Sequence, residues 1–151
     1  MDLKGVLVDF GDTLAHIDEE NRTRYEEELL STARKYGYQK DLDNLTSVLH
    51  NTSRNSHKGE IKDYQEFWGL FLKSLGIPEK SALTEKLEET RNRHLSTIFR
   101  LYAGATAVLS NLRRKYKLAL VSNCAIGTFD IIKALGLVDF FDCVILSYEV
   151  K

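Results

Sequence analysis

Cysteine is scarce in this sequence, and its scarcity excludes two kinds of protein. The only cysteines are Cys124 and Cys143, which are too few to form the disulfide framework of a small secreted domain. Their spacing also lacks the CxxC or Cys/His pattern of a zinc site. Both lie in or beside apolar runs, which is typical of small buried thiols. A reactive thiol remains the alternative for Cys124.

An excess of charge and long apolar runs are also missing. Lys and Arg number 21 against 22 Asp and Glu, with a net charge of −1, and the basic residues are scattered. There is therefore no electrostatic reason to expect a nucleic-acid partner. No apolar stretch has the length of a membrane span and no signal peptide is visible. We expect a cytoplasmic protein without a membrane partner.

Short apolar runs alternate with helical patterns at both ends of the chain. Residues 3–8, 117–123 and 142–147 predict strands, and residues 105–115 and 128–135 predict helices between them. The continuous apolar end of the first run suits a parallel strand buried on both faces. Strand–helix–strand units with short links predict the α/β class, with a doubly wound, parallel, Rossmann-like sheet.

Between these strands lies an all-helical insert. The apolar spacing predicts four helices within residues 18–99, while the polar residues 51–60 predict a loop. A stripe around Trp68 at helical spacing predicts the core of the insert rather than a substrate contact. We therefore expect an α/β core formed by residues 1–16 and 101–151, and a helical cap formed by residues 17–100. Because ligands bind beyond the carboxyl ends of parallel strands, this cap would cover the site.

The residues that end the first two strands could carry chemistry. Asp9 follows "VLV", and Ser122 and Asn123 end "LALVSN", so Asp9 and Ser122 should converge at one edge of the sheet. Phe10 and Gly11 follow Asp9, where small residues let backbone N–H groups approach an anion. A carboxylate nucleophile with a hydroxyl and amides suits phosphoryl transfer. The repulsion between carboxylate and phosphate implies Mg²⁺.

These segments resemble the haloacid dehalogenase superfamily of hydrolases. "VLVDFGDTL" is similar to the first motif of that family, "LALVSN" is similar to the second, and the insert matches a helical cap. The resemblance implies that Asp9 is the nucleophile, forms an aspartyl-phosphate and binds Mg²⁺, with the carbonyl of Gly11 as a second metal ligand. It also implies that Ser122 and the amides near Phe10 and Gly11 hold the phosphoryl group of a small phosphorylated metabolite.

The first departure from the family pattern concerns the acid–base group. Family phosphatases have a second aspartate two residues after the nucleophile, where this chain has Gly11, and Asp12 comes one position later. General acid–base catalysis contributes typically about 10²–10⁴ in rate. Asp12 is the candidate for this role, and the alternative is a cap on the amides of its own turn.

The second departure concerns the end of the sequence. The family has a lysine as its third motif and an acidic pair as its fourth, whereas this sequence ends at Lys151, short of the position of that lysine. The resemblance therefore implies the front portion of a longer protein, with a sheet that is incomplete at its C-terminal end. We expect the strand "GVLV" to form an open apolar edge prone to self-association, and this chain to be weak or inactive as an enzyme.

Three functions remain open. A Mg²⁺-dependent phosphatase is favoured over a metal-independent haloacid dehalogenase that uses Asp9 to displace a halide from carbon. A non-catalytic protein that keeps the fold is the third. Outside the motifs, Arg54 could contact an anionic substrate and His16 could face the cleft, but both fit surface or packing positions, as do His50, His57 and His94.

Overall fold

Three parallel strands form the sheet of the α/β core. The fold was obtained as a computed structural model that describes residues 3–150, so Lys151 lies outside the described residues. The strand order is β1-β4-β5, with β1 at Gly5–Val8, β4 at Lys117–Ser122 and β5 at Cys143–Leu146. The predicted α/β class with a parallel sheet is confirmed.

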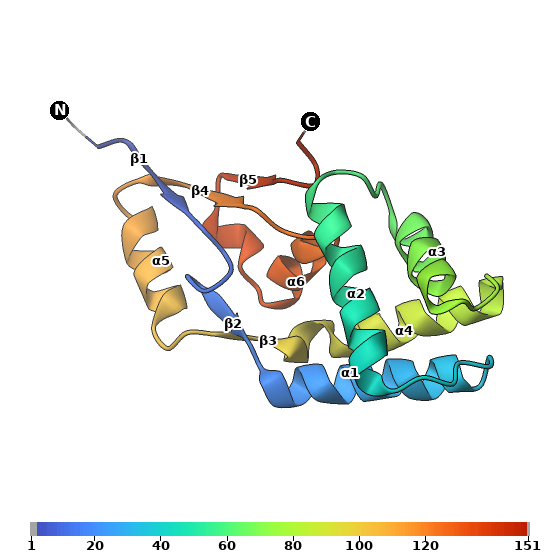
Figure 1. The fold of residues 1–151 in the computed structure, drawn as a ribbon. Helices are drawn as coiled ribbons and strands as arrows, with labels where there is room; N and C mark the ends of the chain where they lie inside the picture. Colours follow the sequence, from blue (N-terminus) through green and yellow to red (C-terminus); the bar gives the residue numbers. More distant parts are fainter. Residues whose placement is uncertain (1–2, 151) are drawn as a thin grey trace.

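Within residues 3–150, helices cover only one face of this sheet (Figure 1). Figure 1 shows α5 (Ala105–Arg113) and α6 (Thr128–Ala134) on the same side of the three strands, and a short 3₁₀ helix, η1 (Val138–Phe140), leads into β5. On the covered face Leu118 and Leu120 are buried, whereas Leu7 is 74% exposed. The prediction that the first strand is buried on both faces is therefore wrong, because no element within residues 3–150 packs over Leu7.

Four helices form the insert that we predict to be a cap, and this insert, called the cap below, lies beside the sheet in Figure 1. They are α1 (Glu19–Arg34), α2 (Leu42–His57), α3 (Tyr64–Leu75) and α4 (Ser81–Ile98). The side chains of Asp18, Asp41 and Asp63 accept hydrogen bonds from the first turns of α1, α2 and α3. None of the helices within residues 3–150 combines the length and the hydropathy that a bilayer crossing requires.

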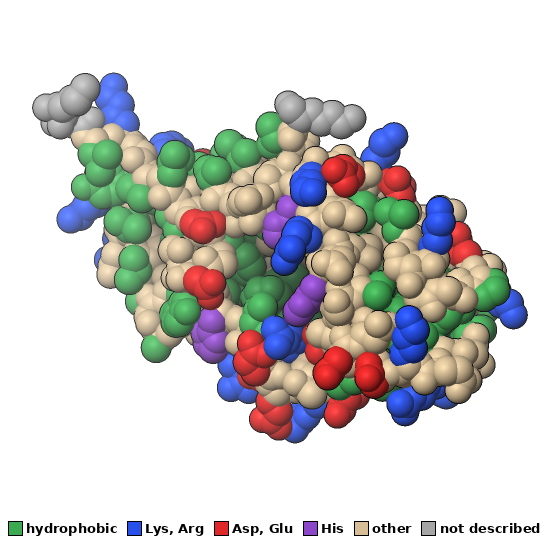
Figure 2. Space-filling view, in the orientation of Figure 1, with side chains coloured by type: hydrophobic (Ala, Val, Ile, Leu, Met, Phe, Trp, Pro, Cys, Tyr) green, Lys and Arg blue, Asp and Glu red, His purple; other side chains and the backbone are tan. Residues whose placement is uncertain are grey.

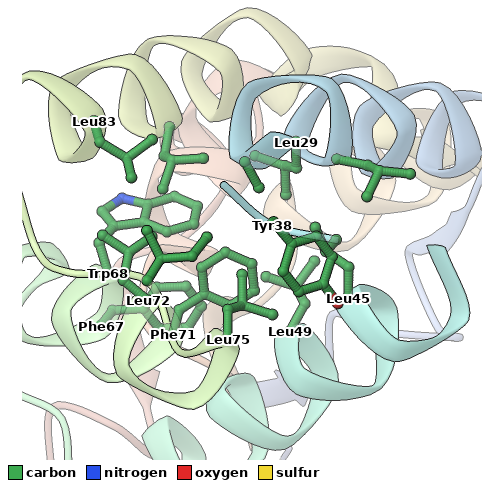
Figure 3. Close-up of a cluster of buried hydrophobic side chains, with 14 of the residues drawn as sticks. Leu29, Tyr38, Leu45, Leu49, Phe67, Trp68, Phe71, Leu72, Leu75 and Leu83 are labelled. Carbon is green, nitrogen blue, oxygen red and sulfur yellow. The ribbon is translucent and has the colours of Figure 1, made fainter. Parts of the chain in front are cut away.

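The cap has a hydrophobic core of its own. Trp68 and Phe71 are fully buried, and their rings meet edge to face with centroids 5.6 Å apart. Figure 3 shows these rings of α3 packed against leucines of the other three cap helices, among them Leu29, Leu45 and Leu83. The stripe around Trp68 thus stabilises the cap itself, as its helical spacing predicts.

The predicted loop at residues 51–60 is wrong, because α2 continues to His57. Polar side chains in this segment donate hydrogen bonds to backbone carbonyl groups of the helix, and the helix continues through them. The Thr52 hydroxyl donates to the Val48 carbonyl at 2.9 Å, and the Ser56 hydroxyl donates to the Ser53 carbonyl at 2.6 Å. Both side chains are buried, so packing against the rest of the protein outweighs their turn preference.

A two-stranded antiparallel sheet joins the cap to the core, and the sequence pattern did not predict it. Strand β2 (Ala15–Ile17) pairs with β3 (Phe99–Leu101), with His16 opposite Arg100. The Asp18 side chain also forms an ion pair with Arg100. The pairing brings together the two places where the chain leaves and re-enters the core, and three-residue strands are too short to show an alternating pattern.

We predict that Leu7→Lys reduces self-association of the chain. Leu7 is an exposed apolar side chain on an edge strand, and a lysine there opposes strand pairing and apolar contact between copies. Sedimentation velocity over a range of concentrations measures the effect. The matched control is Leu70→Lys, which changes a 38% exposed leucine on α3. Equal self-association of the wild type and Leu7→Lys would contradict the prediction.

Candidate functional site

Asp9 and Ser122 meet at the carboxyl ends of β1 and β4. The parallel register pairs Val8 with Leu120, so the residues that follow lie side by side. The Ser122 hydroxyl donates to Asp9 Oδ1 at 2.7 Å, and the Phe10 N–H donates to the same oxygen at 2.7 Å. None of the hydrogen bonds within residues 3–150 reaches Asp9 Oδ2, which leaves this oxygen free to act as a nucleophile or a metal ligand.

The turn after Asp9 separates Gly11 from Asp12. The Phe10 carbonyl accepts from the N–H groups of Leu14 at 2.9 Å and Ala15 at 3.1 Å, which closes the turn. Asp12 has a φ of 55°, in the left-handed region that aspartate tolerates better than most residues. Its side chain is exposed and outside the cavity lining, whereas Gly11 lines the cavity. The role of Asp12 in proton transfer stays a prediction.

A cavity of about 390 Å³ lies between the core and the cap. Phe10, Gly11, Ser122 and Asn123 line its core side. Asp9 is exposed and outside this lining, and its hydrogen bond to Ser122 connects it to the cavity. Figure 2 shows the molecule hollowed here, with hydrophobic side chains at the bottom, acidic groups on the core side and basic groups on the side of α2. The volume is in the range of small-molecule sites.

Helix α2 contributes a polar face to this cavity. His50, Ser53 and His57 line it at helical spacing, and the predicted loop at 51–60 concealed this pattern. Burial and the neighbouring positive charge of Arg54 lower the pKa of His57. Arg54 itself is exposed and outside the lining, so the expected contact between Arg54 and an anionic substrate stays a prediction.

The two cysteines occupy different environments. Cys124 is buried and lines the cavity, and its N–H donates to Ser147 Oγ at 3.0 Å. Burial raises the pKa of the Cys124 thiol, which disfavours the reactive thiolate and supports a packing role. Cys143 is exposed, so the expectation that it is a buried thiol is wrong, because its side chain lies on the uncovered face of the sheet.

The groups that could hold Mg²⁺ are few but suitable. Asp9 Oδ2 and the Gly11 carbonyl oxygen accept none of the hydrogen bonds within residues 3–150, and both are hard oxygen donors. Within that range no three His, Cys, Asp or Glu side chains gather as a metal site. Mg²⁺ commonly binds through one or two carboxylates together with waters and substrate phosphate. The donors present therefore fit a site completed by such ligands.

The loop after Ser122 attaches the cap to the core. The Ile126 N–H donates to Ser56 Oγ of α2 at 3.1 Å. Arg91 of α4 lies 3.8 Å from the centroid of the Tyr64 ring, and its Nη2 is 2.9 Å from Asp130 Oδ2 of α6. The segment that follows Ser122, a predicted phosphate-binding residue, therefore holds the cap against the core.

Gly127 makes this close approach of cap and core possible. It has a φ of 84°, and a Cβ atom added there would overlap the Tyr64 hydroxyl and crowd Arg91. Gly136 has a φ of 69° but has open space around the same position. Substitutions at Gly136 and Gly127 can therefore be compared to separate the cost of backbone strain, present at both positions, from the cost of steric overlap, present only at Gly127.

We predict that Gly127→Ala destabilises the protein more than Gly136→Ala does. Both substitutions place a side chain in the left-handed region, at a cost of about 1–2 kcal/mol. Gly127→Ala adds the cost of overpacking, about 1–3 kcal/mol, because Tyr64 and Arg91 must move. Urea unfolding measures the two free energies of unfolding. Equal losses in the two variants would show that the cap does not sit against Gly127.

Comparisons with known proteins support the fold. No family model and no curated protein matches the sequence. Among solved structures, the chain is similar to a HAD phosphatase from Thermococcus onnurineus, with 25% identity and a TM-score of 0.62, covering 98% of this chain and 64% of that one. It is similar to a HAD-family enzyme from Bacteroides thetaiotaomicron in complex with magnesium and inorganic phosphate, with 22% identity and a TM-score of 0.66, covering 98% and 70%.

A third similar structure is a 2-haloacid dehalogenase from Pseudomonas syringae pv. tomato, with 16% identity and a TM-score of 0.63, covering 99% of this chain and 66% of that one. The chain thus spans 64% to 70% of the length of these three structures. The phosphatase and the dehalogenase among these structures share the architecture found in this chain. The comparisons therefore identify the fold, and they do not distinguish between the two reactions.

Proposed function

We propose that this chain, which has the haloacid dehalogenase fold with a helical cap, provides the nucleophile and the substrate pocket of a Mg²⁺-dependent phosphatase for a small phosphorylated metabolite. The observation that carries the proposal is the contact between Ser122 Oγ and Asp9 Oδ1 at 2.7 Å, through which the exposed Asp9 meets a residue that lines the cavity between cap and core. This contact holds one carboxylate oxygen and leaves the other one free.

The chemistry follows from the two oxygens of Asp9. One oxygen of the Asp9 carboxylate attacks the phosphorus atom while the other stays available to the metal, the bond between phosphorus and the ester oxygen breaks, and the alcohol leaves with one proton. Water then attacks the aspartyl-phosphate, which releases phosphate and restores Asp9. Ser122 and the amides near Phe10 and Gly11 stabilise charge on the phosphoryl oxygens. When bound by Asp9 and Gly11, Mg²⁺ would neutralise charge between the carboxylate and the phosphate.

The leaving alcohol needs a proton, and the position two residues after Asp9 does not supply it. Gly11 has no side chain that can donate. We propose Asp12 as the donor, acting directly or through water when substrate binds. This assignment also explains why the chain would be a slow enzyme, since an exposed group on the next position of the turn is poorly placed for proton transfer.

A dehalogenase is the second candidate, and a specific observation favours it. Much of the cavity wall is apolar, with Tyr25, Leu49 and Phe67 among the lining residues, and displacement of halide from carbon needs no proton donor at position 11. In that reaction Asp9 attacks carbon and the halide leaves with the electron pair. A non-catalytic role is the third candidate, favoured by the absence of a carboxylate at Gly11.

We predict that Asp9→Asn abolishes hydrolysis of p-nitrophenyl phosphate in the presence of Mg²⁺. Loss of a nucleophile costs on the order of 10³-fold or more in rate. The matched control is Asp43→Asn, which changes an exposed aspartate at the start of α2 and should keep the wild-type rate. Hydrolysis by Asp9→Asn at the wild-type rate would remove the proposed nucleophile. Turnover of 2-chloropropionate without metal, and none of the phosphate ester, would favour the dehalogenase.

We predict that Gly11→Asp increases phosphatase activity by about 10²-fold, the lower end of the contribution of general acid–base catalysis. A Cβ atom added at Gly11 meets nothing within 4 Å, and the φ of Gly11 lies outside the left-handed region, so the fold accommodates the new side chain. Gly11→Asn is the matched control, because it has the same shape without the acid. Equal rates for the two variants would show that position 11 does not reach the leaving group.

A further inference from the structure

Ser147 is the first residue after β5, and it contacts the segment that follows the predicted phosphate-binding residue Ser122. Strands β4 and β5 lie side by side (Figure 1), and their ladder ends where Ser122 pairs with Leu146. The Ser147 N–H donates to the Ser122 carbonyl at 3.0 Å. The backbone of Ser147 therefore holds the residue whose hydroxyl is bonded to Asp9.

The Ser147 side chain extends this contact beyond the end of the ladder. Its Oγ accepts a hydrogen bond from the Cys124 N–H at 3.0 Å and donates to the Cys124 carbonyl at 3.3 Å, since one hydroxyl can accept and donate at once. Cys124 is only 7% exposed. Removal of the Ser147 hydroxyl would therefore leave buried backbone groups without a partner, which is costly.

The contacts of Ser147 lie on both sides of Asn123. Asn123 lines the cavity together with Ser122, and within residues 3–150 its N–H donates none of the hydrogen bonds. An amide without a partner beside Ser122 is the kind of donor that stabilises charge on phosphoryl oxygens. The position of this amide depends on the two flanking residues, and Ser147 is bonded to both of them.

The chain after Cys124 is attached to other parts of the molecule. The Ile126 N–H donates to Ser56 Oγ of the cap at 3.1 Å, and α6 begins at Thr128. Within residues 3–150, the hydrogen bonds of the Cys124 backbone all go to Ser147. Ser147 is therefore the residue that fixes the stretch between the end of β4 and the first contact with the cap.

We propose that Ser147 is a positioning residue, which acts through residues 122–124 and holds Ser122 and Asn123 where both bind one phosphoryl group. The inference rests on the proposed function for the nature of the ligand, and it assigns Ser147 no contact with the substrate. Ser147 lies outside the residues that line the cavity. Its role arises from the pairing of β5 with β4, which brings together residues far apart in sequence.

The test measures the affinity of the chain for inorganic phosphate in the presence of Mg²⁺ by calorimetry. We expect Ser147→Ala to weaken binding by about tenfold, which corresponds to the free energy of one hydrogen bond, because phosphate must then order residues 122–124. Ser147→Thr keeps the hydroxyl and should bind phosphate with the affinity of the wild type. Circular dichroism checks the fold of each variant.

Thr52→Val is the matched control for a purely structural effect. It also removes a buried hydroxyl that donates to a backbone carbonyl, that of Val48 at 2.9 Å, but Thr52 lies outside the cavity lining. Urea unfolding measures the stability of both variants, and the phosphate affinity should fall only in Ser147→Ala. Amide hydrogen exchange needs no ligand, and exchange at Cys124 should be faster in Ser147→Ala than in the wild type.

The outcomes distinguish this inference from the proposed function. Wild-type affinity for phosphate in a folded Ser147→Ala protein overturns the inference, and so does an equal loss of affinity in Thr52→Val. A loss that is confined to Ser147→Ala and recovered in Ser147→Thr supports it. If the wild type binds no phosphate, the proposed function fails. Faster exchange at Cys124 in Ser147→Ala would then still support the positioning role of Ser147, and unchanged exchange would overturn it.

Discussion

The candidate site depends on the parallel pairing of β1 with β4. This pairing places Asp9 and Ser122 at the same edge of the sheet and within 2.7 Å of each other. Because side chains alternate between the faces of a strand, a shift of register by one residue would turn Ser122 away from Asp9. The hydrogen bond also orients the carboxylate, since Oδ1 is occupied by Ser122 and Phe10 and Oδ2 is left for chemistry.

The cap depends on the same edge of the sheet. The segment after Ser122 contacts α2 through Ile126 and Ser56, and α6 contacts α4 through Asp130 and Arg91. A displacement of the cap would therefore disturb the residues that follow Ser122, and a displacement of these residues would disturb the cap. The short β2–β3 ladder fixes the other end of the cap. The cavity between these attachments combines Gly11, Ser122 and Asn123 of the core with an apolar wall and the charged side chains of Arg22 and Glu26 of the cap.

Much of the fold could be predicted from local patterns. The apolar runs predicted the three strands, and the stripe around Trp68 predicted α3. Such patterns arise because side chains that face the core recur at every second residue of a strand and at every third or fourth residue of a helix. The apolar pattern gave wrong predictions at positions whose structure depends on tertiary packing. Residues 51–57 have turn-forming side chains, yet Thr52 and Ser56 are buried in a helix. Leu7 has the character of a core residue, yet it lies on a face that no described helix covers.

The sequence by itself determined the α/β class and the helical insert, and it singled out Asp9 and Ser122 as candidate site residues, because each depends on residues that are close together in the chain. Only the tertiary structure showed that Glu26, Arg22 and His50 share the cavity with Ser122, since α1 and α2 come together through contacts between residues far apart in sequence. A buried glutamate on a charged helix has the same local pattern as an exposed one. What distinguishes Glu26 is its loss of solvent, and that depends on how the helices pack.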